Sequence, residues 1–513
     1  MSSVEAQRQP AHPVEPPGLL AAKAVTSGAW VFALNFINRG LGLIRTVILA
    51  RLLTPDDFGL LGLALLITAT LETLSQTGFY GAIIQRQNKP ESYLNTAWTC
   101  SALRGMCLFV LLYALSPQLA RFFEDPRVVP IIRVIAVSML LSGFANIGVV
   151  CFKKDLEFKK YFTYETLGNM ADIVTSIAMA FCLRSVWAMV IGGLAGHAMR
   201  LVLSYGLHPY RPALAFDLPK FKELFAFGKW MLAAGVMHFL ITKADDLFVG
   251  KYFGVAALGL YQMAYLLSNV TTTDLVYSIS QIAFPAYSKI QNDRASLSEA
   301  YLKVIRGVAF AAVSVALILF AFASELVTLF FGEQWLPMVP VLEVLALAGL
   351  ARSIQSTAVP IFLAMDRPKI HSEINFVRAA VLFACIYPFS QAWGVLGVAY
   401  AVLASCVVSV LAVSLRIPAV LDLRASQFYL SIAAPLLPAG VTLTAVMLAK
   451  QAGVESESWR FFFLPLLGVS VYLALSLTVD GLLKYGVGQT VRALWQHLVP
   501  GRNLCIQKAG RQP

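Results

Sequence analysis

Apolar segments of about 20 residues recur along this chain, and no other feature limits its fold as strongly. A segment of roughly that length is what an α-helix needs to cross a lipid bilayer. The backbone finds no water to bond inside a bilayer, so only helices and closed β-barrels span it. Barrel strands alternate apolar and polar residues, and these segments do not. With 58% hydrophobic and 13% charged residues, against about 25% charged in soluble domains, the sequence predicts an all-α polytopic membrane protein.

The apolar segments predict fourteen transmembrane helices. Their approximate ranges are 24–48, 58–80, 94–115, 129–151, 163–183, 186–207, 225–250, 255–285, 304–323, 336–363, 371–390, 393–415, 428–449 and 461–479. The eighth and tenth exceed the length of a simple span, so we expect them to tilt, to break or to continue past the membrane.

The basic residues are distributed unevenly between the two sides of these helices. Loops rich in Lys and Arg stay in the cytoplasm. With both termini cytoplasmic, and with residues near a span end counted with the adjoining loop, 26 of the 40 Lys and Arg residues lie on the cytoplasmic side, 7 on the opposite side and 7 within spans. The sequence therefore predicts a cytoplasmic N-tail (1–23) and a basic cytoplasmic C-terminal tail (480–513).

An internal repeat with an offset of 200 residues organises the chain. Segment 27–66 aligns with segment 227–266 without a gap, and the coinciding pairs include Trp30 with Trp230 and Gly59 with Gly259. Each copy reads as a helix, a short basic loop and a second helix. Many transporters are built from such repeats and place their site between them.

Six predicted helices precede the second copy of the repeat. We therefore expect two six-helix lobes, 24–207 and 225–416, with a cytoplasmic linker (208–224) between them. A further helix pair (428–479) follows the second lobe.

Several functions are not supported by any sequence pattern. The seven cysteines lack metal-ligand spacing, and the basic residues form no compact patch for nucleic acid. The chain has no nucleophile elbow, phosphate loop or zinc motif, and little of it lies outside the predicted helices to fold a catalytic domain. We therefore expect no enzyme activity, no metal, no cofactor and no nucleic-acid partner.

Ionisable residues stand on polar stripes inside the predicted helices. They include Arg39, Arg45, Glu72, Asp172, Lys243, Asp245, Asp246, Arg352 and Arg378. Polar stripes often hold membrane helices together, and that interpretation stays open for the Asn, Ser and Thr residues and for His238. A charge at bilayer depth costs several kcal/mol unless it meets water, a partner or a substrate. The ionisable residues therefore favour a hydrated cavity, in which Lys243 and Asp246, three positions apart, can pair.

The stretch ARLLTPDDFGLLGLALLITATLETLSQTGFYGAIIQRQ (50–87) resembles a hallmark of bacterial polysaccharide-repeat-unit flippases. These Wzx-type proteins form a branch of the multidrug/oligosaccharidyl-lipid/polysaccharide exporter superfamily. Members carry a similar A-R-x-L-x-P-x-D-F-G-x-x-G element after the first helix. A second element follows the second helix and is matched here by Gly78, Ala82, Ile84 and Gln85. The stretch DDLFVGKYFGVAALGLYQMAYLL (245–267) resembles the corresponding element of the second lobe.

The first of these elements also has a structural interpretation. Pro55 and the two aspartates that follow it fit the start of a helix, where the missing N–H is tolerated and carboxylates meet the positive end of the helix dipole. Gly59 and Gly62 give a small face for close packing. We interpret these residues as structural.

The resemblance implies a two-lobed transporter of the bacterial inner membrane. Its substrate would be an undecaprenyl-diphosphate-linked oligosaccharide, moved from the cytoplasmic to the periplasmic leaflet. Polysaccharide polymerase and chain-length components are the partner proteins it suggests. Candidate contacts for the anionic headgroup are Arg39, Arg45, Lys243, Arg352 and Arg378. Candidates for sugar hydroxyls or a coupling cation are Asp172, Asp245, Asp246 and Glu72. By the same resemblance, the last two helices form a groove for the lipid tail.

Three alternatives remain at this point. A cation-coupled drug exporter of the same superfamily would favour an acidic, aromatic cavity over several cations. A membrane-embedded polysaccharide polymerase or ligase would carry a large periplasmic loop, whereas the longest one expected here has about a dozen residues. If the protein were a purely structural membrane scaffold, its intramembrane charges would have no role.

Overall fold

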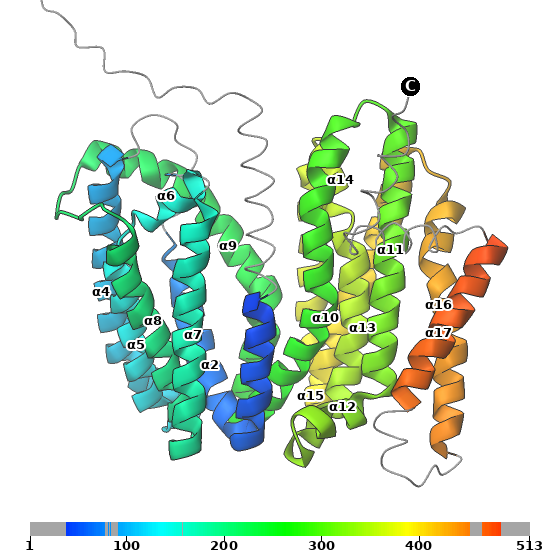
Figure 1. The fold of residues 1–513 in the computed structure, drawn as a ribbon, viewed down its shortest axis with the longest axis horizontal. Helices are drawn as coiled ribbons and strands as arrows, with labels where there is room; N and C mark the ends of the chain where they lie inside the picture. The colour runs from blue at the N-terminus through cyan, green and yellow to red at the C-terminus, as the bar shows by residue number, and fades with distance from the viewer. Residues whose placement is uncertain are drawn as a thin grey trace, which may run out of the picture. The chain divides into compact units, whose positions relative to one another are not determined.

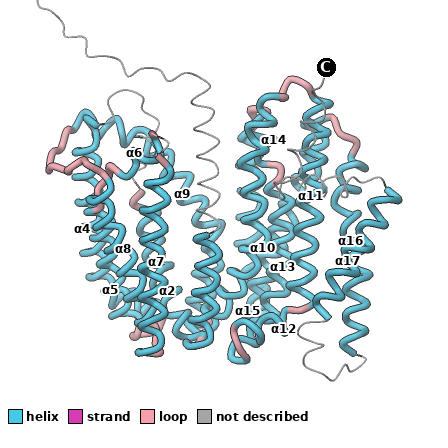
Figure 2. The backbone as a smooth tube through the Cα atoms, in the orientation of Figure 1, coloured by secondary structure: helices cyan, strands magenta, loops and turns pink. Residues whose placement is uncertain are grey.

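The computed structural model of this chain describes residues 37–76, 79, 81, 83, 91–155, 157–451 and 464–483. Helices make up nearly all of these residues, and no strand occurs among them (Figures 1 and 2). The all-α class is thereby confirmed. Trp30, Gly78, Ala82, Ile84, Gln85, the N-tail and the tail from residue 484 lie outside the described residues.

The chain divides into two compact units. Among described residues, the first unit comprises 37–52, 67–119 and 128–236, and the second comprises 53–66, 120–127 and the residues from 237 on. Two helices, α2 (Pro55–Leu74) and α9 (Leu218–Tyr252), are therefore divided between the units. The lobe boundaries drawn from the sequence repeat stay a prediction.

The first unit is a group of packed helices. Besides parts of α2 and α9, it contains a helix over residues 37–52, α4 (Glu91–Phe122), α5 (Val128–Phe144), α6 (Val149–Lys154), α7 (Phe158–Leu183) and α8 (Trp187–Leu207). Helices α7 and α8 lie side by side (Figure 1). Glycines allow this close approach: a Cβ on Gly196 would lie 2.9 Å from the Cβ of Asp172 and 3.1 Å from the carbonyl oxygen of Gly168.

The second unit holds the remaining helices. These are α10 (Gly254–Lys289), α11 (Arg294–Ala321), α12 (Ala323–Phe330), the 3₁₀ helix η1 (Glu333–Met338), α13 (Val339–Ser356), α14 (Val359–Ala364), α15 (Pro368–Leu421), α16 (Ala425–Gln451) and α17 (Leu464–Leu483). The helix α13 packs on α10, α11 and α15, and α16 lies against α11 and α17. The core of this unit is therefore centred on α13.

The 54 residues of α15 form two helices joined at a kink. A straight helix of that length would extend about 80 Å, far more than a bilayer is thick. Gly394 interrupts it with φ +61° and ψ −137°, a conformation that L side chains rarely adopt. The kink separates the two segments that the sequence predicts at 371–390 and 393–415.

By length and composition, eight helices among the described residues can cross a membrane. They are α2, α4 from Tyr93, α7, α8, α11, the run Glu333–Ala364, α15 and α16. Two shorter apolar helices are Val128–Phe144 and Leu464–Thr478. Each of the fourteen predicted segments overlaps a described helix. The polytopic membrane fold is thereby confirmed.

The start of α2 has the structure expected from its motif. The helix begins at Pro55, with Asp56 and Asp57 in its first turn. Thr54 Oγ1 donates to Asp57 Oδ2 at 2.7 Å, and Asp57 N donates back to Thr54 Oγ1 at 3.3 Å. This reciprocal bonding satisfies backbone donors that a helix start leaves free.

Within the second unit, α2 crosses α10 at glycines, and the contacts are reciprocal. A Cβ on Gly59 would lie 1.9 Å from the carbonyl oxygen of Val255, and a Cβ on Gly259 would lie 2.0 Å from that of Pro55. Residues 55 and 255, like 59 and 259, are equivalent under the 200-residue repeat. The two copies therefore meet in a local two-fold relation, in which each glycine faces the backbone of the other copy.

Ion pairs hold the same end of α2. Arg127 Nη1 lies 2.6 Å from Asp56 Oδ2, and Arg127 Nη2 lies 2.7 Å from Asp125 Oδ2. The hydrogen bonds from Arg127 hold the pKa of the Asp125 carboxyl below its usual value. Nearby, Lys251 Nζ lies 2.7 Å from Glu124 Oε1. The turn after α4 is thus fixed to the first turn of α2 and to the end of α9.

The crossing predicts opposite effects for two glycine substitutions. Gly59→Ala places a methyl group against a backbone oxygen, and such overpacking costs about 1–3 kcal/mol of the free energy of unfolding. Gly193→Ala, where a Cβ meets nothing within 4 Å, should instead stabilise α8 slightly by reducing backbone entropy in the unfolded chain. Thermal unfolding of the two purified variants in detergent compares them. Equal midpoints would show that the crossing tolerates a side chain.

Candidate functional site

The first unit contains a charge pair between two helices. Arg45, on the helix over 37–52, places Nη2 2.9 Å from Asp172 Oδ1 on α7 and 2.9 Å from Ser176 Oγ. Ser176 in turn donates to Asp172 at 3.0 Å. Both charged side chains are partly buried, so each offsets much of the cost of burying the other.

A second charged cluster in this unit was missed by the sequence analysis. Arg200 on α8 binds Glu165 Oε2 at 3.3 Å and also donates to Asn169, both on α7. Tyr161 donates to the same glutamate at 3.0 Å. An arginine within an apolar segment was the available signal, the same one that identified Arg45.

The first unit also contains two other candidates, Arg39 and Glu72. Arg39 is exposed on the helix over 37–52. Glu72 lies near the end of α2, where Arg104 is its electrostatic neighbour. Arg104 itself donates weakly to the carbonyl oxygen of Ser75 at 3.4 Å.

In the second unit, Lys243 and Asp246 on α9 form the pair expected from their spacing. Lys243 Nζ lies 2.8 Å from Asp246 Oδ2. The Asp246 carboxylate is almost fully buried, whereas 41% of the Lys243 side chain is exposed. The adjacent Asp245 points elsewhere: it is 2% exposed and accepts a 2.8 Å hydrogen bond from Tyr261 on α10.

An arginine from α13 lies close to this cluster. Arg352 is 8% exposed, donates through Nη1 to the Tyr265 hydroxyl, and lies 4.7 Å from the centre of that ring. Its Nε and Nη2 have no hydrogen-bond partner in the described part of the chain, and neither does Asp245 Oδ1. Arg378 on α15 is an electrostatic neighbour of Tyr265, and its Nε likewise lacks a described partner.

The second unit therefore gathers five candidates around α9, α10, α13 and α15: Lys243, Asp245, Asp246, Arg352 and Arg378. Tyr261, which fixes Asp245, was not recognised from the sequence because tyrosine is common in apolar helices. Among the described residues, no group of three or more His, Cys, Asp and Glu side chains could hold a metal ion. The cluster therefore places hydrogen-bond donors that can bind an anion beside buried carboxylates.

Taken together, the apolar helices and the charges within them are those of a multi-pass membrane protein. The structure is similar to that of the lipid II flippase MurJ in an inward closed conformation, with a TM-score of 0.71 and 18% identity over 88% of this chain and 98% of that one. It is also similar to an inward-facing multidrug resistance transporter of the MATE family, with a TM-score of 0.61 and 14% identity over 74% of this chain and 94% of that one. At these identities the likeness establishes the fold.

The chain belongs to the polysaccharide biosynthesis protein family, whose model matches residues 48–340. It is 27% identical over 419 residues to the lipopolysaccharide biosynthesis protein WzxC of Escherichia coli (strain K12), covering 81% of this chain and 85% of that protein. It is 26% identical over 446 residues to the teichuronic acid biosynthesis protein TuaB of Bacillus subtilis (strain 168), covering 86% and 90%. The resemblance found in the motifs is confirmed, and the comparisons indicate a transporter and no enzyme.

The Arg45–Asp172 pair predicts a compensating double substitution. Asp172→Asn leaves the Arg45 guanidinium partly buried without its counterion, so folded yield should fall. Asp172→Asn combined with Arg45→Gln removes both charges and should recover most of that yield, because a buried pair contributes little net stability. Size-exclusion profiles in detergent measure the folded fraction. If the double variant falls below both single variants, the pair is not the reason for the loss.

Proposed function

We propose that this protein moves an undecaprenyl-diphosphate-linked oligosaccharide repeat unit from the cytoplasmic to the periplasmic leaflet of the bacterial inner membrane. Both termini would be cytoplasmic. Transport would proceed by alternating access through a hydrated cationic cavity between the two lobes that the sequence repeat predicts. The product would serve surface polysaccharide synthesis, with a polymerase as the next enzyme.

The observation that carries this proposal is the combination of cations inside apolar helices with family membership. The names of the relatives concern lipopolysaccharide and teichuronic acid biosynthesis, and the solved neighbour is a flippase for lipid II. A diphosphate headgroup needs charge-assisted donors inside the membrane, and Arg and Lys provide them. The drug exporter alternative shares the fold, so the fold does not separate the two. Family membership favours the glycan.

Lys243 is the cation best prepared for such a headgroup. Its ammonium is fixed by Asp246, yet much of the side chain remains exposed. A held but accessible cation loses less freedom when an anion binds than a mobile one does. Arg39 is exposed, and in this role it adds long-range attraction.

Arg352 and Asp245 have a different part in the proposal. The Nε and Nη2 atoms of Arg352 form the edge of a guanidinium that binds a phosphate in bidentate fashion. Both atoms lack a described partner, but the side chain is 8% exposed, so the headgroup reaches it only after the helices rearrange. Asp245, with one free oxygen, would then bind a sugar hydroxyl or a coupling cation.

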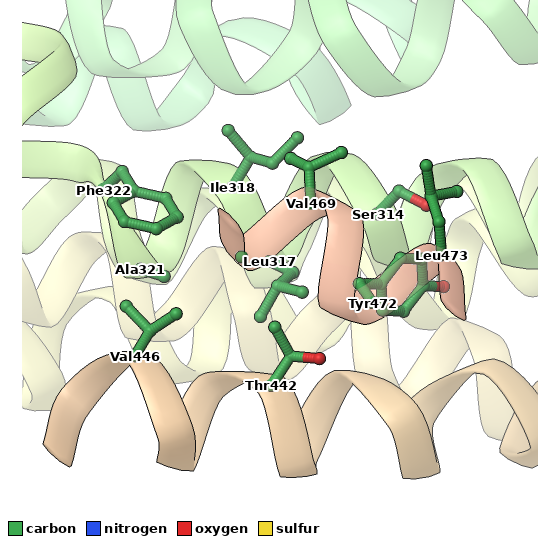
Figure 3. Close-up of a pocket in the computed structure, with 11 residues that line it drawn as sticks. Ser314, Leu317, Ile318, Ala321, Phe322, Thr442, Val446, Val469, Tyr472 and Leu473 are labelled. Carbon is green, nitrogen blue, oxygen red and sulfur yellow. The ribbon is translucent and has the colours of Figure 1, made fainter. Parts of the chain in front are cut away.

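An apolar hollow in the second unit suits the lipid tail. Figure 3 shows side chains from α11, α16 and α17 turned toward it, with Leu317, Ile318 and Val446 among them. The hydroxyl-bearing residues at its wall are Ser314, Thr442 and Tyr472. The Tyr472 hydroxyl faces Phe310 O at 3.4 Å, which leaves a surface of mainly hydrocarbon. We propose that isoprenoid carbons lie in this hollow during transport.

The cationic candidates predict a loss of export for each protein molecule that reaches the membrane. Arg39→Ala, Arg45→Ala and Lys243→Ala should each lower polysaccharide export about ten-fold or more, because a hydrogen bond to a charged group contributes roughly 1.5–3 kcal/mol. The assay measures surface polysaccharide in the native host with the chromosomal gene deleted, normalised to protein in the membrane. Wild-type export by all three variants would show that these residues contribute only to helix packing.

The two adjacent aspartates predict unequal effects. Asp246→Asn should reduce folded yield and export, since it weakens the contact that fixes Lys243, and Lys243→Met in the same chain should restore folding. Asp245→Asn should fold normally but export poorly, with a changed dependence on pH or sodium. Folded yield and export are measured for each variant. Normal export by Asp245→Asn, beside an inactive but well-folded Asp246→Asn, would reverse the assignment.

A further inference from the structure

The proposed function assigns no role to a polar cluster between α7 and α8. The cluster consists of Tyr161, Glu165 and Asn169 on α7 and Arg200 on α8. We propose that it is a sugar-recognition site, in which Arg200 and Glu165 together bind two neighbouring hydroxyls of the transported glycan. The inference rests on the proposed function and adds to it the place in the first unit where the sugar part of the substrate binds.

The hydrogen bonds within the cluster use only part of each side chain. Glu165 accepts from the Tyr161 hydroxyl at 3.0 Å through Oε1 and from Arg200 Nε at 3.3 Å through Oε2. Arg200 Nη2 donates to the side-chain oxygen of Asn169. Neither Arg200 Nη1 nor Asn169 Nδ2 forms a hydrogen bond with a residue that the structure describes. Each carboxylate oxygen of Glu165 keeps a second lone pair, so donors and acceptors remain available side by side.

The depth of the ion pair in its helices indicates that the exposed part of the pair faces water. Glu165 lies seven residues after Phe158, the first residue of α7, and Arg200 lies seven residues before Leu207, the last of α8. Both are therefore about 10 Å inside their helices. An ionised side chain that met lipid at that depth would be costly. Because 23% of the Arg200 side chain and 27% of the Glu165 side chain are exposed, the cluster borders a hydrated space.

The cluster belongs to a longer polar stripe of α7. Residues three or four positions apart share one face of a helix, and the polar residues on this face are Tyr161, Glu165, Asn169, Asp172 and Ser176. The stripe extends about 22 Å along the helix. Arg200 binds to one half of it, and Arg45 binds Asp172 and Ser176 in the other half. A glycan of several rings would therefore meet hydrogen-bonding groups along the whole stripe.

Gly168 lets Arg200 lie over this stripe. A Cβ on residue 168 would lie 2.5 Å from Arg200 Cγ and 2.8 Å from its Nε, so a larger residue would push the side chain away from α7. Two of the guanidinium nitrogens are then fixed by Glu165 and Asn169. A guanidinium that is held in one position before the ligand arrives loses less freedom when the ligand binds.

The charge of the cluster favours a neutral sugar over the diphosphate. Arg200 and Glu165 balance each other. The cluster of the second unit instead has three cations and two carboxylates: Lys243, Arg352 and Arg378 with Asp245 and Asp246. A hydroxyl both donates and accepts, so one hydroxyl can accept from Arg200 Nη1 while its neighbour donates to Glu165. An ionised diphosphate has no hydrogen to donate and would be repelled by Glu165.

Removal of both charges separates sugar binding from helix packing. The double variant Glu165→Gln with Arg200→Gln leaves no uncompensated charge, so its folded yield should stay near that of the wild type. Its polysaccharide export, normalised to protein in the membrane, should fall about ten-fold, because hydrogen bonds to charged groups are lost. The matched control is Glu299→Gln with Lys303→Gln, an exposed ion pair on α11, which should export normally.

Binding of two lipids shows which part of the substrate is affected. The probes are undecaprenyl diphosphate without sugar and the lipid-linked glycan extracted from the deletion strain. Each is titrated against purified protein in detergent, and the rise in the midpoint of thermal unfolding reports binding. The wild type should bind the glycan-bearing lipid about ten-fold more tightly than the bare lipid. The double variant at 165 and 200 should bind the bare lipid normally and lose this preference, whereas Lys243→Ala should weaken the binding of both lipids.

The preference for the glycan-bearing lipid decides the outcome. If the double variant keeps it, the ion pair only joins α7 to α8, and the inference is overturned while the proposed function stands. Equal binding of the two lipids by the wild type would also overturn the inference. If neither lipid binds the wild type, the proposed function fails, and the inference fails with it. Should the double variant not fold, Arg200→Lys takes its place, since lysine keeps the ion pair but lacks the guanidinium fork.

Discussion

A charged side chain inside an apolar helix needs a partner, and that requirement determines which helices of this protein lie together. Arg45 brings the helix over 37–52 to α7, and Arg200 joins α8 to α7. Where the partner stands on the same helix, as with Lys243 and Asp246, the neighbouring helix is free to supply something else. Here α10 supplies a hydrogen bond to the Asp245 carboxylate through Tyr261. The charges thus organise the packing and leave selected atoms available.

The close crossing of α2 and α10 fixes how these two helices pack in the second unit. Two helices can approach this closely only where small residues leave no bulky side chain between them. Glycines of both helices meet this condition here. The motif that resembles the flippase hallmark includes the start of α2 and contains Gly59 and Gly62, the glycines that α2 brings to this contact.

The sequence predicted correctly the features that depend on residues near one another in the chain. Segments of about 20 apolar residues identified the helices, because a bilayer permits few other structures. The spacing of Lys243 and Asp246 predicted their pairing, since positions three apart share a helix face. Which helices are neighbours is a non-local property, and spacing does not encode it. The partners of Arg45 and Arg352 therefore emerged only from the structure. Arg200 was overlooked because it was counted with the adjoining loop.

The glycine at position 62 follows from the symmetry of the contact. Near a two-fold axis, equivalent residues compete for one space, so two side chains of ordinary size cannot both occupy it. At 59 and 259 both copies carry glycine, and the helices touch through their backbones. At 62 and 262 one copy carries glycine and the other glutamine, whose amide fills the space that both would need. A repeat that had stayed identical at this position would have either a void or a clash. The departure from symmetry thus admits one polar side chain, that of Gln262, at the contact between the two copies.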